Sequence, residues 1–167
     1  MRRTVLAVVL MLSVGLMSPL MAKNKGTSKD MRDAHAIYIG WVDMSADDYR
    51  KQGYSSREQY QAVLDGANIG FQKDLQSRLS GRTVNAAKKS SDTDAAGNDV
   101  YIKFSDAYYD RGYRLHVAVH FIDVKTNAEI GSIPLTRHGA HLCGFEGCLN
   151  KELEEVSKEI SEQFGAK

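Results

Sequence analysis

The sequence predicts an α+β fold, a two-layer sandwich in which two helices cover one face of a mixed five-stranded sheet. Three observations predict it. Five segments alternate apolar and polar residues as strands do, and two segments repeat apolar residues at helical spacing. Their order is strand, helix, four strands, helix (β-α-β-β-β-β-α). A strand-helix-strand unit gives a parallel pair, and the last three strands, joined by short turns, give an antiparallel meander. Each helix has one apolar stripe, so both pack on the same face.

The first strand is expected at 35–44, with Ile37 and Ile39 on one face. The strongest helix follows. Ser55 and Glu58 have the spacing of a capping box, and Gly81 stands where a helix-ending glycine is common. The apolar stripe of this helix comprises Tyr60, Val63, Leu64, Ala67, Phe71, Leu75 and Leu79.

Two glycines, Gly66 and Gly70, stand four residues apart inside this helix. Each weakens a helix by about 1 kcal/mol relative to alanine. Close packing of the helix on the sheet is the favoured explanation, and a helix-dimer seam is the alternative.

The remaining strands are expected at 83–88, 100–109, 113–124 and 129–136. Asn127 suits a turn with positive φ, and Pro134 marks an edge strand because proline cannot donate to a ladder. Strict alternation assigns one face of the 113–124 strand to the core, namely Leu115, Val117, Val119 and Phe121. Asn150 is expected to cap the last helix, whose buried stripe is Leu153, Val156, Ile160 and Phe164.

The first 22 residues have the layout of a secretory signal peptide. Arg2 and Arg3 precede an uncharged apolar run over 5–17, and Ala22 offers a small residue for cleavage. The run is shorter than the roughly 20 residues of a transmembrane helix, although an uncleaved anchor is the alternative. We therefore expect a signal peptide at 1–22, a flexible leader at 23–34 and one domain at 35–165, soluble and either periplasmic or secreted.

Charge argues against a nucleic-acid partner. The chain has a net charge of +1, which becomes −1 once Arg2 and Arg3 leave with the signal. Nucleic-acid binding calls for a concentrated basic face. The sequence holds no glycine-rich phosphate loop, Gly-x-Ser-x-Gly or His-Glu-x-x-His. We therefore expect no cofactor and no enzymatic activity.

The hairpin around residues 113–130 resembles a small α/β domain of bacterial envelope proteins. The stretch Ile122-Asp123-Val124-Lys125-Thr126-Asn127-Ala128-Glu129-Ile130 is similar to the Asp-x-Lys-Thr-Gly hairpin of three families, with Asn127 in place of glycine. These are the TolB N-terminal domain, the curli-secretion lipoproteins and the lipoprotein activators of penicillin-binding proteins. The chain also resembles small exported proteins of Bacteroidetes. The resemblance implies an envelope module that binds a partner, and it transfers no site residues.

One dense group of metal-type ligands stands at His138, His141, Cys143 and Cys148. Two imidazoles and two thiolates suit a zinc or copper site. In an exported protein, however, the favoured state of Cys143 and Cys148 is a disulfide. A metal-binding protein built on these four residues is the alternative function.

The favoured function is recognition of a protein or cell-wall glycan partner. Tyrosine and arginine, which are frequent in binding hot spots, gather around two strands as Tyr101, Tyr108, Tyr109, Arg111 and Tyr113. Ordinary β-propensity of tyrosine is the competing explanation. The edge strand with Pro134 is a second candidate surface, because a partner strand could add to it.

His116 and His120 share one face of a strand, about 13 Å apart, so they cannot chelate one metal together. A hydrolase on this face is the third possibility, and it requires a partner for the histidine that the sequence does not reveal.

Overall fold

The computed structural model describes residues 30–87, 93, 99–110, 114–138 and 144–165. Two short 3-10 turns accompany the main elements, η1 (Met31–Asp33) and η2 (Ala46–Arg50). The strands and helices in chain order are β1 (Ala36–Ile39), α1 (Arg57–Arg78), β2 (Thr83–Ala86), β3 (Val100–Tyr109), β4 (Arg114–Asp123), β5 (Ala128–His138) and α2 (Phe145–Gln163).

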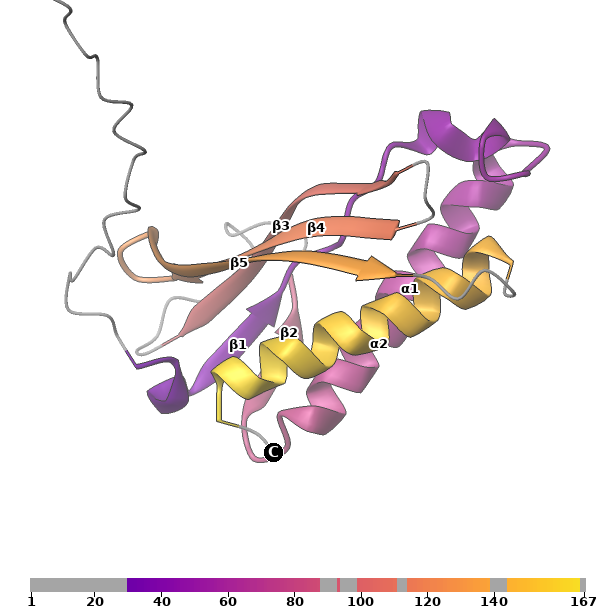
Figure 1. Ribbon diagram of the computed structural model, residues 1–167. Helices are drawn as coiled ribbons and strands as arrows, with labels where there is room; N and C mark the ends of the chain where they lie inside the picture. Colours follow the sequence, from indigo (N-terminus) through magenta and orange to yellow (C-terminus); the bar gives the residue numbers. More distant parts are fainter. Residues whose placement is uncertain (1–29, 88–92, 94–98, 111–113, 139–143, 166–167) are drawn as a thin grey trace, which may run out of the picture.

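The five strands form one mixed sheet in the order β2-β1-β3-β4-β5. β1 pairs in parallel with β2 and with β3, whereas β3, β4 and β5 form an antiparallel meander. Both helices run along the same side of this sheet, side by side (Figure 1). The predicted α+β fold, with its two layers and mixed sheet, is therefore confirmed.

The main core lies between the sheet and the two helices, and strand alternation explains it. The predicted core face of β4 is buried, as are the helix-facing residues of β1 and the first half of β3. The helices contribute their apolar stripes to the same cluster. A second, smaller cluster of Tyr38, Ala87 and Tyr101 lies on the opposite side of β1 and β3.

Two predicted helix starts are wrong. Ser56, not Ser55, caps α1, and its hydroxyl accepts a hydrogen bond from the Gln59 N–H at 3.2 Å. α2 begins at Phe145 after Gly144, so Asn150 lies inside the helix and does not cap it. Tertiary packing explains the earlier start, because Phe145 packs against the core and Leu149 is buried in it.

Gly66 and Gly70 do not serve close packing on the sheet. A methyl group added at either position would meet no atom within 4 Å outside the local helix. Both glycines line an open groove of about 310 Å³ between α1 and α2, with Phe71 and Leu153 among its walls.

The loop after β1 is fastened to α1 by a buried amide. Asn68 is 3% exposed, and its Oδ1 accepts from the Val42 N–H at 2.8 Å. Its Nδ2 donates to the Val42 carbonyl at 3.1 Å and to the Leu64 carbonyl at 3.0 Å. One side chain therefore satisfies both backbone groups of Val42 inside the core.

Two β-bulges change which face the strand residues occupy. In β3 the register shifts between Ser105 and Tyr108, and Asp106 has a φ of 54°. In the β4–β5 pair, Phe121 faces Gly131 but Ile122 faces Glu129, so Ile130 is the extra residue. Each bulge reverses the alternation beyond it.

The hairpin turn and the edge strand agree with the sequence. Asn127 has the positive φ, 52°, that its place in the turn predicts. β5, which contains Pro134, lies at one edge of the sheet.

The predicted signal peptide lies outside the described residues. At the end of the predicted leader, η1 forms a 3-10 turn and Ala34 is 5% exposed. No helix in the described part of the chain has the length and apolar character needed to cross a membrane.

Candidate functional site

The face of β3, β4 and β5 opposite the helices is the candidate site, here called the open face. Cross-strand pairing defines it: Lys103 lies opposite His120, Ser105 opposite Ala118, Tyr108 opposite His116, and Thr136 opposite His116 on the other side. Paired residues project from the same face of a sheet. The open face also includes Ser132, Pro134 and Glu129, through their pairs with His120, Ala118 and Ile122.

At one end of the open face, Tyr108 stacks on His116. The two rings are nearly parallel, at 6°, with their centroids 4.7 Å apart. Tyr108 is 49% exposed. Among the described residues, it and Ile69 are the large hydrophobic side chains that are exposed to solvent. This stack is a flat aromatic surface available to solvent.

Hydrogen bonds fix the His116 ring from both sides. Its Nε2 lies 3.0 Å from Asp110 Oδ2, and its Nδ1 lies 3.3 Å from Thr136 Oγ1. A neutral ring satisfies both contacts when Nε2–H donates to Asp110 and Nδ1 accepts from the threonine hydroxyl. The ring that supports Tyr108 is therefore held in one orientation.

Further along the same strands, His120 links a serine to a carboxylate. Its Nε2 lies 2.9 Å from Ser105 Oγ, and its Nδ1 lies 3.0 Å from Glu129 Oε2. The Ser105 hydroxyl also donates to Asp106 Oδ2 at 3.0 Å, so its single proton has two acceptors. The His120 side chain is about a quarter exposed, at 25%.

The predicted tyrosine group is divided by the sheet. Tyr108 lies on the open face, and Tyr109 points to the helices, where its ring contacts Phe145. Tyr101 is buried in the smaller cluster. Arg111 and Tyr113 lie outside the described residues. Of the described tyrosines in this group, only Tyr108 presents a large exposed surface.

Tyr109 donates a hydrogen bond to a buried carboxyl group, Glu152 of α2. Glu152 is 3% exposed, and its Oε1 has no hydrogen-bond partner. Burial raises the pKa of Glu152 to about 7, although the hydrogen bond from Tyr109 opposes the shift. Burial, with the neighbouring carboxylate, raises the pKa of Tyr109 far above its usual value. The closed surroundings of this pair make it a core feature and not a binding surface.

The cysteine and histidine group lies largely outside the described residues. His141 and Cys143 are not described, and for His138 only the backbone is, at the end of β5. Cys148 is buried in the first turn of α2. The disulfide and the alternative metal site both stay predictions. Among the described residues, no three His, Cys, Asp or Glu side chains are placed to hold a metal ion.

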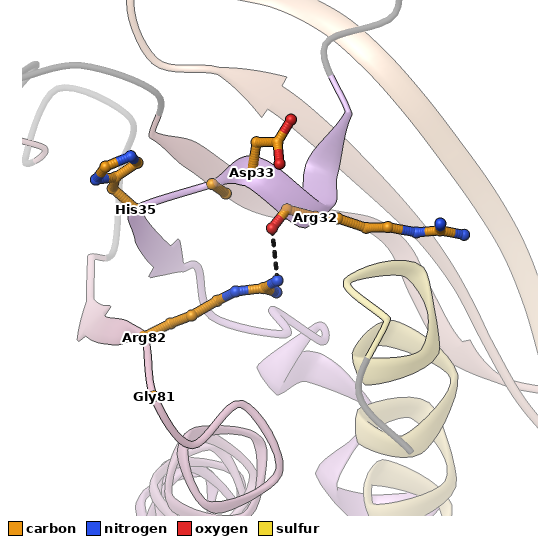
Figure 2. Close-up of a pocket in the computed structure, with 6 residues that line it drawn as sticks. Arg32, Asp33, His35, Gly81 and Arg82 are labelled. Atoms are coloured by element: carbon orange, nitrogen blue, oxygen red, sulfur yellow. Dashed lines mark hydrogen bonds between the residues drawn. The ribbon is translucent and has the colours of Figure 1, made fainter.

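A pocket of about 560 Å³ lies where β1 and β2 begin, with Arg32, Asp33, His35 and Arg82 in its walls. Arg82 Nη2 donates to the Arg32 carbonyl at 2.7 Å and to the Phe164 carbonyl at 2.9 Å. Figure 2 shows that the Arg32 and His35 side chains point away from each other. Arg82 therefore ties the end of α2 to the start of the domain, and the Arg32 and His35 side chains do not converge on a ligand.

The sequence did not reveal the partners of the two histidines. Ser105, Asp110, Glu129 and Thr136 come from three segments that only the sheet register brings together. A signal was present for Glu152, since it stands three residues after Leu149 and four before Val156, on the apolar stripe of α2.

No protein-family model and no curated protein matches this sequence. Among solved structures, the chain is similar to the PelC dodecamer of Paraburkholderia phytofirmans, at 14% identity and a TM-score of 0.49, over 81% of this chain and 90% of that one. A point variant of the same protein is 14% identical with a TM-score of 0.48, over 81% of this chain and 89% of that one. A neuraminyllactose-binding hemagglutinin homologue from Helicobacter pylori is 11% identical with a TM-score of 0.44, over 79% of this chain and 83% of that one. Likeness at this level assigns no function, which must come from the site itself.

Proposed function

We propose that this chain is an exported binding module that recognises a saccharide, such as a cell-wall glycan, on its open face. The observation that carries the proposal is the exposed Tyr108 ring stacked on His116. A sugar ring has an apolar C–H face that packs on an aromatic ring, and its hydroxyls need donors and acceptors around that ring. Asp110 and Thr136, which hold His116, lie beside the stack and supply both kinds of group.

The chemistry of the open face favours a sugar over a protein. Tyr101 and Ile122 also belong to this side of the sheet, but they pack in the smaller cluster at one end of it. Apart from these two and Tyr108, its residues are small, hydroxylated or ionisable: Lys103, Ser105, Arg114, His116, Ala118, His120, Glu129, Ser132, Pro134 and Thr136. The centre of a protein interface is apolar and depleted of charged residues. A flat polar surface with one aromatic ring matches a polyhydroxylated ligand better.

Strand addition at β5 is less favoured, although β5 is an edge strand. Pro134 stands in the middle of β5, opposite Ala118. Proline has no N–H, and in a strand its non-donating side faces the free edge. An added strand would meet this gap in the row of donors, which is how natural edge strands resist pairing.

The proposal is tested by titrating the exported protein with soluble sugars. The full chain is expressed in a bacterium and purified from the exported fraction, where we expect the mass of a mature chain that begins at Lys23. Peptidoglycan disaccharide, chitohexaose and dextran are then titrated and followed by calorimetry and amide chemical shifts. We expect at least one of them to bind, with shifts centred on β3 and β4.

Two variants localise the binding. Tyr108→Ala removes the stacking ring, and we expect at least a tenfold loss of affinity, about 1.4 kcal/mol. Ile69→Ala is the matched control, because Ile69 is exposed to a similar extent, 47%, but lies on α1. Equal affinity of the Tyr108 variant, or binding only of proteins and of no sugar, would overturn the proposal.

A further inference from the structure

Ser105, His120 and Glu129 have the connectivity of a serine hydrolase triad. In such a triad the hydroxyl contacts Nε2 of the histidine, and the carboxylate contacts Nδ1. The same two contacts occur here, at 2.9 Å and 3.0 Å. From this geometry we infer that the open face hydrolyses small acyl esters, with Ser105 as nucleophile and His120 as general base.

Each member has a defined part. When Nδ1–H donates to Glu129, Nε2 is left to accept the Ser105 proton, so Glu129 selects the tautomer that a general base needs. Glu129 is thus a positioning residue. Lys103 stands opposite His120 and two residues before Ser105 on the same strand, so it adds a positively charged side chain to the face that holds both residues.

The backbone beside the nucleophile is unusual. Asp106, the next residue, has a φ of 54° and lies in the bulge of β3. Few non-glycine residues adopt this region, aspartate and asparagine more readily than most, and bulges concentrate at functional sites. The bulge also leaves one residue of β3 out of the ladder with β4, directly beside Ser105.

The reaction balances with water as the only co-reactant. Ser105 Oγ forms a bond to the ester carbonyl carbon while its proton passes to His120 Nε2. The carbon–oxygen bond to the alcohol then breaks, and His120 returns the proton to the leaving oxygen. Water then attacks the carbonyl carbon of the acyl-serine while His120 Nε2 takes its proton. His120 returns this proton to Ser105 Oγ as the acyl–oxygen bond breaks, which releases the carboxylic acid and restores Ser105.

Its position on the open face suggests the natural substrate. Tyr108 and Ser105 lie on the same strand, on the same face, either side of the bulge. A saccharide stacked on Tyr108 would present its next residue to Ser105. The substrate class is therefore an O-acylated saccharide, and this part alone rests on the proposed function.

The test uses p-nitrophenyl acetate, which contains no sugar, with the exported protein. We expect saturable hydrolysis above the buffer rate and covalent labelling of Ser105 by a fluorophosphonate probe, located by peptide mass. Ser105→Ala and His120→Ala are each expected to lower the rate about 100-fold or to the buffer rate. Ser77→Ala is the matched control, an exposed serine on α1 and outside the open face, and it should keep the full rate.

Two further variants separate chemistry from damage to the fold. Asp106→Asn keeps a residue type that tolerates positive φ and replaces the competing carboxylate with an uncharged and weaker acceptor, so we expect the rate to rise several-fold. Glu129→Gln should lower kcat with little change in KM, and Glu129→Asp should restore part of kcat.

Failure here is distinguishable from failure of the proposed function. No hydrolysis and no labelling of Ser105, or equal rates for Ser105→Ala and the native chain, would overturn the inference even when a sugar binds. Hydrolysis that depends on Ser105 in a protein that binds no sugar would support the hydrolase and leave the saccharide proposal refuted.

Discussion

The protonation of Glu152 sets a pH dependence of stability that one substitution should remove. In the folded chain the pKa of Glu152 is about 7, against an ordinary value of 4.5. Between these two values the unfolded chain has released the proton while the folded chain still holds it. Stability therefore falls as the pH rises through this window, because the unfolded state binds fewer protons.

The size of the effect follows from the shift. A pKa difference of one unit corresponds to about 1.4 kcal/mol, so a rise from 4.5 to about 7 costs the folded state about 3 kcal/mol above pH 7. Below pH 4.5 the cost vanishes, because the carboxyl is protonated in both states. Glu152→Gln is neutral at every pH, and its carbonyl oxygen can accept the hydrogen bond from Tyr109.

The assay is urea unfolding followed by circular dichroism, at about pH 4, about pH 6 and about pH 8. We expect the free energy of unfolding of the variant, relative to that of the native chain, to rise by about 3 kcal/mol from the lowest to the highest pH. Glu162→Gln, at an exposed position of the same helix, should show no such change. A difference between Glu152→Gln and the native chain that stays constant across this range would refute the reasoning, as would one that shrinks with rising pH.

Two further predictions concern α1. Asn68→Ala leaves the buried N–H and carbonyl of Val42 without partners, so we expect a loss of about 3 kcal/mol in urea unfolding. Gln61→Ala, which removes a partly exposed hydrogen bond within the helix, should change stability by less than about 0.5 kcal/mol. Gly66→Ala and Gly70→Ala should each stabilise by about 1 kcal/mol, since the added methyl meets nothing. A lower melting temperature for either glycine variant would contradict this prediction, because it would mean that the added methyl group clashes with a neighbouring atom.

Much of the architecture could be predicted from the sequence because it follows from short-range patterns. Alternation located the core face of β4, and helical spacing located both helices. Pro134 predicted the edge strand, and Asn127 predicted the turn with positive φ. Each of these depends on residues a few positions apart, so the local sequence contains the information.

Tertiary packing determines where α2 begins and what surrounds the two glycines of α1. Asn150 is a good cap by residue type, yet the helix extends back to Phe145 because that ring and Leu149 pack in the core. Gly66 and Gly70 suggested a close contact with the sheet, and the structure places them on an open groove. Neither outcome could be derived from propensity, since both depend on what lies across the helix.

The pairing register of the strands determines which residues form the candidate site. Plain alternation from Phe104 would put Tyr108 among the core residues, and plain alternation from Gly131 would put Glu129 there too. The bulge at Asp106 turns Tyr108 to the open face, and the extra residue Ile130 turns Glu129 to the same face. The sequence by itself determined the α+β class, the core face of β4 and the edge strand. Only the tertiary structure could join Tyr108 to His116 and Glu129 to His120, because a shift of one residue in pairing exchanges the two faces of a strand.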